Sequence, residues 1–199
     1  MRGMFLICGF LLGLALPAAA AETNAEGGDA AVEAAPRKPS EIRAEQLDIL
    51  FARLYRSQGL GTDGLEQKIW DLWSASDSPT AEVLLQQAGR AMDDGAPAEA
   101  LSILDRLIGA NPDFAEAWNK RAILYFMMKR DDASLKDIDK VLELEPRHFG
   151  ALAGRGMILQ RQKKYAAAME AYREALALNP GMEAVKQAVK ELERLEQGI

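Results

Sequence analysis

Apolar side chains recur at helical spacing through most of the chain. The first such stretch fills one helix face at i, i+3, i+4, i+7 and i+8, with Leu47, Leu50, Phe51, Leu54 and Tyr55. This spacing predicts an amphipathic helix over about 41–57. The glycine-containing segment 59–64 ends the pattern, and a second apolar face with Trp70 and Trp73 follows it. We therefore expect a helical hairpin over 41–78.

Three further hairpins follow at a fixed interval. Each ends at a proline, and 34 residues separate Pro112 from Pro146 and Pro146 from Pro180. That interval is the period of a helix-turn-helix repeat array. The three repeats occupy 81–114, 115–148 and 149–182. Positions 8 and 20 of each repeat carry small residues that let two helices approach closely, namely Ala88, Ala122, Gly156, Ala100, Ser134 and Ala168.

A last apolar face predicts a capping helix over 183–199. Its apolar residues are Val185, Ala188, Val189, Leu192 and Leu195, and charged residues occupy the opposite face. Such a helix is expected because the last repeat of an array must cover its exposed core. The predicted fold is all-α, a helix-turn-helix repeat solenoid between an N-terminal hairpin and a C-terminal capping helix.

The repeats resemble tetratricopeptide repeats. The second repeat matches that family's pattern at Trp118, Ala122, Tyr125, Ser134, Ile138 and Pro146. The third matches at Gly156, Tyr165, Ala168, Tyr172, Ala175 and Pro180. Arg121 and Arg155 depart from the pattern, since the family has leucine there. The hairpin at 41–78 resembles a degenerate fourth unit, and the whole layout resembles small exported repeat proteins of Gram-negative bacteria.

The N-terminal residues have the pattern of an export signal. Arg2 precedes an apolar run over 5–16, and small residues follow, which predicts a signal peptide over 1–21. The alternatives are an uncleaved membrane anchor and a lipidated Cys8, and both fit the pattern less well. Residues 22–40 have no apolar periodicity and predict a disordered linker. Cleavage removes the apolar run, so we expect no stable membrane insertion of the mature protein. It also removes the only cysteine, and a cysteine-free exported helical protein fits the periplasm.

Composition argues against several classes of function. The 24 Lys and Arg against 30 Asp and Glu give a net charge of -6 with no basic cluster, so nucleic acid is not an expected partner. His148 is the only histidine, and no nucleophile elbow or phosphate loop accompanies it. The acidic residues lack the spacing of a calcium loop. The sequence therefore predicts a protein that is not an enzyme and takes no metal or cofactor.

The resemblance implies a concave groove lined by the first helix of each repeat. A two-carboxylate clamp for chaperone C-termini is not expected there, because Lys120 is the only cation at the five clamp positions. The run from Ala122 to Met128 is wholly apolar and covers every side of a helix. We expect this run to present an apolar surface to a protein partner. The predicted groove residues are Leu85, Met92, Asn119, Lys120, Ile123, Phe126, Met127, Met157 and Arg161.

Two alternatives remain open from the sequence. In one, the N-terminal hairpin or the last helix folds over the apolar strip and buries it. In the other, the protein is a self-associating structural unit whose hairpin or last helix docks on a second copy. The favoured prediction is a scaffold that binds an apolar peptide or helix of an envelope protein.

Overall fold

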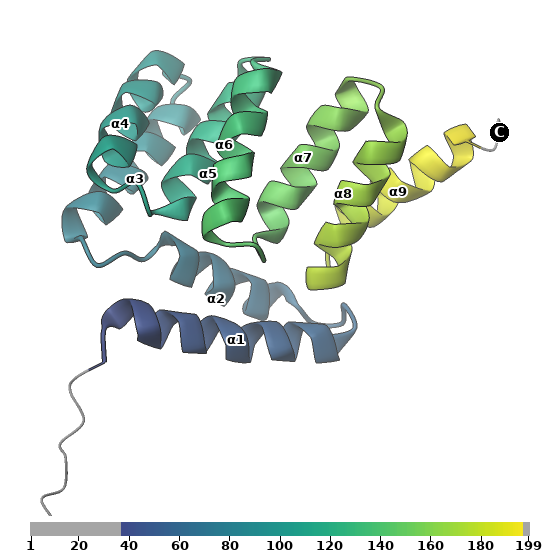
Figure 1. Ribbon diagram of the computed structural model, residues 1–199, viewed down its shortest axis with the longest axis horizontal. Helices are drawn as coiled ribbons and strands as arrows, with labels where there is room; N and C mark the ends of the chain where they lie inside the picture. The colour runs from purple at the N-terminus through teal and green to yellow at the C-terminus, as the bar shows by residue number, and fades with distance from the viewer. Residues whose placement is uncertain (1–36, 197–199) are drawn as a thin grey trace, which may run out of the picture. The chain divides into compact units, whose positions relative to one another are not determined.

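The computed structural model describes residues 37–196, with the side chains of Asp63 and Glu196 excepted (Figure 1). The predicted signal peptide, most of the predicted linker and residues 197–199 lie outside the described residues. Within 37–196 the chain forms helices and no strand. The helices are α1 (Pro39–Ser57), α2 (Asp63–Ser74), α3 (Pro79–Asp93), α4 (Pro97–Ala110), α5 (Ala115–Met127), α6 (Asp131–Leu144), α7 (Phe149–Arg161), α8 (Tyr165–Leu178) and α9 (Glu183–Glu196). None of these helices is long and apolar enough to span a bilayer.

The repeat hairpins are the pairs α3 with α4, α5 with α6, and α7 with α8. Small residues lie where the two helices of a pair approach, as predicted, and Ala88, Ala100 and Ala168 are fully buried. Gly156 needs to be glycine, because a Cβ atom there would overlap the ring of Tyr172. A residue with positive φ lies in the turn after the first helix of every repeat, and these residues are Gly95, Lys129 and Lys163.

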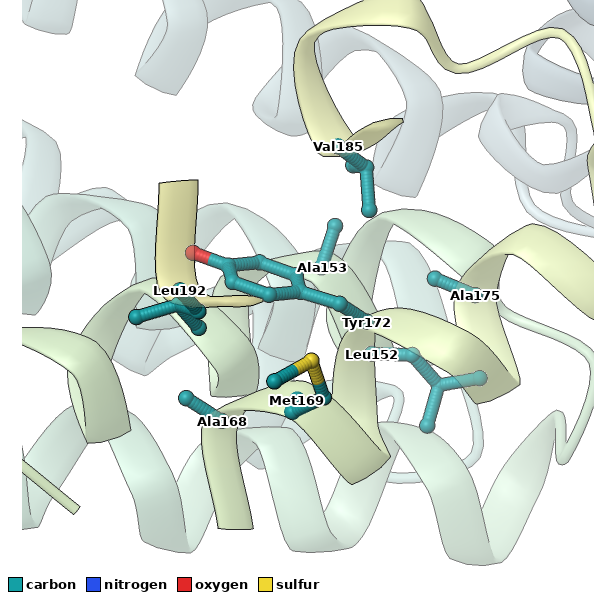
Figure 2. Close-up of a cluster of buried hydrophobic side chains, with 8 residues drawn as sticks. All are labelled: Leu152, Ala153, Ala168, Met169, Tyr172, Ala175, Val185 and Leu192. Atoms are coloured by element: carbon teal, nitrogen blue, oxygen red, sulfur yellow. The ribbon is translucent and has the colours of Figure 1, made fainter. Parts of the chain in front are cut away.

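The last repeat and the capping helix share one hydrophobic cluster, which Figure 2 shows. Val185 and Leu192 of α9 are buried against α7 and α8, and Tyr172 lies among them. The Tyr172 hydroxyl donates a hydrogen bond to Gln160 Oε1 at 2.7 Å. Leu195, the last apolar residue predicted for the buried face of this helix, is instead 53% exposed.

Alkaline titration of Tyr172 is a test of this cluster. Burial first, and then the nearby charge of Glu191, raise the pKa of Tyr172 to about 12. Because the folded-state pKa lies above the ordinary value near 10, the stabilisation is complete below about pH 10. It is lost as the pH rises toward 12. Tyrosinate absorbance should show one residue titrating late in the wild type and absent in Tyr172→Phe; late titration retained in that variant would contradict the assignment.

The two arginines that depart from the family pattern, Arg121 and Arg155, form ion pairs between neighbouring repeats. Arg121 pairs with Asp137 of its own repeat at 2.8 Å and with Asp105 of the preceding repeat at 2.7 Å. The hydrogen bonds that Arg121 donates to Asp137 hold the pKa of Arg121 above its ordinary range. Arg155 occupies the same position one repeat later and pairs with Asp139 at 2.5 Å. Ion pairs between repeats thus replace the apolar contact that the family has there.

The α1–α2 hairpin does not continue the stack of repeats. Figure 1 shows both helices running across the ends of the repeat helices. Phe51 of α1 and Trp73 of α2 pack against Phe149 at the start of α7, with ring centroids 6.3 Å and 5.0 Å away. The hairpin therefore differs from the degenerate fourth unit suggested by its sequence. Four of the five residues predicted for the apolar face of α1 are buried, but Tyr55 is 64% exposed. The buried face covers the turns between repeats.

Contacts at two of the turns hold the hairpin in this place. Arg147, in the turn before α7, pairs with Asp48 of α1 at 2.6 Å. In the turn before α9, the Pro180 carbonyl lies so close to Gly59 that a Cβ atom would not fit. The turn before α5 faces α1 across a cavity of about 710 Å³. The hairpin thus packs along one edge of the array and contacts the turns between repeats.

Candidate protein-binding groove

The first helices of the three repeats, α3, α5 and α7, are packed in sequence and form one face. We call this surface the binding face. Helix α2 lies against its edge and contacts α5. Two recesses open along α2, one between α5 and α7 and the other between α3 and α5.

The recess between α5 and α7 is an apolar pocket of about 440 Å³. Its walls are aliphatic and aromatic side chains, together with the small residues of α7. The lining residues are Trp70, Asn119, Ala122, Ile123, Phe126, Ser134, Ile138, Gly150, Ala151, Ala153, Gly154, Met157, Ile158 and Met182. A pocket of this size and character fits one or two large apolar side chains.

The rim of the apolar pocket is open to solvent. Ile123 is 40% exposed and Met157 48% exposed, and Met127 at the end of α5 is 59% exposed. Their exposure bears on the first alternative from the sequence, in which the hairpin or the last helix buries the strip. The hairpin covers only the edge of the binding face, where Trp70 forms a wall of the pocket. Residues 37–196 therefore leave the apolar strip accessible.

Arg161 holds Phe126 in place at the far end of the pocket. Its guanidinium carbon lies 4.0 Å from the centre of the Phe126 ring, and the same guanidinium pairs with Asp131. A cation over an aromatic face is attractive. Arg161 is therefore engaged within the chain, and its contribution to the groove is to orient Phe126.

Asn119 differs most from its prediction as a groove residue that faces a partner. It is only 3% exposed, and its amide donates to Glu116 Oε2 at 3.0 Å. Glu116 is itself buried and lies 3.3 Å from His148 Nε2. The Ala151 amide donates to His148 Nδ1, so the proton of a neutral ring is on Nε2 and points to Glu116. Asn119 and His148 together satisfy a buried carboxylate.

The second recess, about 380 Å³ in volume, is polar, and we call it the acidic recess. It brings together the predicted residues Leu85 and Lys120, although Leu85 is buried in its floor. Its other lining residues are Asp71, Ser74, Ala75, Glu82, Gln86 and Gly89. Met92 lies half-buried against the core of the first repeat, and neither recess is lined by Met127 or Arg161.

Several residues that shape the binding face could not be identified from the sequence. Trp70 and Asp71 reach it from α2, so no repeat position marks them. Met182 reaches it from the turn before α9, at the last position of its repeat and not on a first helix. Glu116 is an acidic residue in the first turn of α5, and no sequence pattern marks it as a buried carboxylate. Within the described residues, no three His, Cys, Asp or Glu side chains gather as metal ligands would.

Comparison with known proteins assigns the family. A tetratricopeptide repeat profile matches residues 150–182, and a second matches 85–140. A TPR repeat-containing protein of Rhizobium etli is 34% identical over 177 residues, which cover 88% of this chain and 83% of that protein. The chain belongs to the tetratricopeptide repeat (TPR) family. TPR arrays are protein–protein interaction scaffolds, and the chain falls in that class.

Further comparisons match smaller parts of the chain. Human protein SGT1 homolog is 29% identical over 117 residues, which are 58% of this chain and 32% of that protein. Among solved structures, the first TPR of Spaghetti (RPAP3) bound to an HSP90 peptide has a TM-score of 0.58 at 21% identity. The alignment covers 61% of this chain and 96% of the RPAP3 chain. MamA has a TM-score of 0.55 at 20% identity and covers 80% of this chain and 84% of its own. These structures share the TPR fold.

Proposed function

We propose that this TPR protein is a non-enzymatic scaffold of the bacterial periplasm that binds an apolar peptide or helix of an envelope protein. The observation that carries the proposal is the open apolar pocket between α5 and α7, with Ile123 and Met157 exposed at its rim. An apolar helix or extended peptide buries such a surface on binding. Methionine at the rim suits segments of varied shape, because its side chain is flexible and polarisable.

Structures of the same fold support a peptide ligand. The first TPR of Spaghetti (RPAP3) is bound to an HSP90 peptide, and the second TPR domain of human RPAP3 is in complex with an HSP70 peptide. The apolar pocket of this chain differs from an anion-binding clamp, since its polar side chains, Asn119 and Ser134, are both engaged within the chain. The proposed ligand is therefore apolar at this pocket.

The periplasmic location rests on the signal-like residues 1–21. N-terminal sequencing of the protein recovered from a periplasmic fraction should begin near Glu22. A chain that keeps Met1 and stays in the cytoplasmic fraction would exclude this location.

The binding function is tested by placing a charged side chain at the rim of the apolar pocket. Ile123→Glu and Met157→Glu should each reduce binding of an envelope partner at least tenfold, because a carboxylate would be desolvated in an apolar contact. Val83→Glu on α3 is the matched control, since Val83 is 51% exposed and lies outside both recesses. Capture from envelope extract, with circular dichroism to confirm folding, compares the three variants.

Light scattering of the same samples separates partner binding from self-association. The proposal expects a monomer that loses its partner in Ile123→Glu. A dimer of the wild type that becomes monomeric in Met157→Glu would instead show that a second copy occupies the pocket. Equal capture by all variants would exclude the pocket as the binding site.

A further inference from the structure

The acidic recess gives the binding face a charge that the apolar pocket lacks. Asp71 of α2 and Glu82 of α3 both line it, and Lys120 of α5 is the cation opposite them. Lys120 lies 3.8 Å from the buried Glu116 carboxylate. Its charge is therefore already opposed by a carboxylate outside the recess.

Uncharged donors hold the two carboxylates of the recess. Gln67 Nε2 donates to Asp71 Oδ1 at 2.8 Å, and the Ser76 amide donates to Glu82 Oε1 at 2.8 Å. Within residues 37–196, neither carboxylate has a Lys or Arg nitrogen within salt-bridge distance. The lining of the recess thus holds two carboxylates against one lysine and carries net negative charge.

The two recesses adjoin each other along the same two helices. On α2, Trp70 lines the apolar pocket and the next residue, Asp71, lines the acidic recess. On α5, Asn119 and Lys120 are divided in the same way. A segment crossing the binding face from α7 to α3 would pass from the apolar pocket directly to the acidic recess.

From this juxtaposition we infer that the partner segment carries apolar side chains followed by a lysine or arginine, with the cation seated between Asp71 and Glu82. This inference rests on the proposed function and specifies its ligand. Charge complementarity across an interface favours the matching partner and disfavours the opposite charge. Acidic segments, such as the HSP90 peptide SRMEEVD seen with Spaghetti (RPAP3), would meet repulsion at this recess.

End-blocked model peptides test the inference directly. The peptides share a leucine-rich half and carry lysine, glutamine or glutamate in the other half. Binding to the full mature chain is measured by fluorescence anisotropy at low and high salt. We expect the lysine peptide to bind about three- to tenfold more tightly than the glutamine peptide and the glutamate peptide to bind most weakly. Salt should reduce these differences.

The matched variant removes the two charges and keeps the shape of the recess. Asp71→Asn with Glu82→Gln retains an oxygen for each of the two hydrogen bonds, so the fold should be unaffected. In this variant the lysine and glutamine peptides should bind with about equal affinity. It should persist in Glu170→Gln with Glu174→Gln, which removes two charges from the exposed side of α8.

The outcomes separate this inference from the proposed function. If the lysine preference survives the Asp71 and Glu82 substitutions, or if the glutamate peptide binds best, the inference is overturned. The proposed function would still stand in that case, provided that Ile123→Glu weakens all three peptides. If no leucine-rich peptide binds the wild type, both fail.

Discussion

Replacing Trp73 with alanine is expected to destabilise the protein by about 3–5 kcal/mol and to release the α1–α2 hairpin. Trp73 is buried and stacks on His148, with the two ring centroids 4.1 Å apart and the planes 11° apart. It also packs against Phe51 and Phe149. The indole therefore fills the junction between the hairpin and the repeats, and alanine would leave a cavity there.

Urea unfolding followed by circular dichroism measures the loss, and hydrogen exchange locates it. Protection in α1 should fall more than protection in α4, because the hairpin detaches while the repeats keep their own cores. Trp73→Phe is the control. It retains an aromatic ring and removes an indole N–H that is buried without a partner among the described residues. A loss in Trp73→Phe as large as that in Trp73→Ala would contradict the packing argument.

His148→Leu has the second largest expected effect, a loss of about 2–4 kcal/mol. The substitution removes the acceptor that caps α7, which costs about 1 kcal/mol. It also removes the Nε2–H donor from the buried Glu116 carboxylate, and a buried charged group left short of a donor costs about 1–3 kcal/mol. The two effects act at one residue and should appear together in the midpoint of urea unfolding.

A double-mutant cycle separates these two effects. Glu116→Gln removes the buried charge, so His148→Leu should cost less in that background, by roughly 1 kcal/mol or more. The remaining loss reports the cap of α7. Equal losses in both backgrounds would show that the interaction of His148 with Glu116 contributes no stability.

The sequence predicted the repeats well because their rules are local. Proline spacing, small residues at positions 8 and 20, and apolar residues at helical intervals are all set within one hairpin and its neighbour. Gly156 illustrates this, since its small size matches Tyr172 only sixteen residues away, and both belong to the same repeat. Membership in the TPR family could be inferred from the same residues.

Groove positions were harder to predict because exposure depends on neighbours beyond the repeat. Ile123, Met127 and Met157 are exposed as expected, and Phe126 lines the pocket. Asn119 has the same repeat position as Leu85 and was expected to face a partner, yet it is buried beside Glu116. The α2 helix covers that end of the binding face, and no repeat pattern places α2 there.

The sequence by itself determined the helices, their pairing into three TPR hairpins and the apolar character of α5. These follow from periodicity, steric size at the helix contacts and turn residues, all of which act over one or two repeats. Only the tertiary structure decided where the α1–α2 hairpin lies. Its amphipathic face could be buried equally well by stacking on α3 or by lying along the turns. Contacts distant in sequence, such as Asp48 with Arg147 and Trp73 with His148, select the second arrangement and place Trp70 and Asp71 at the groove.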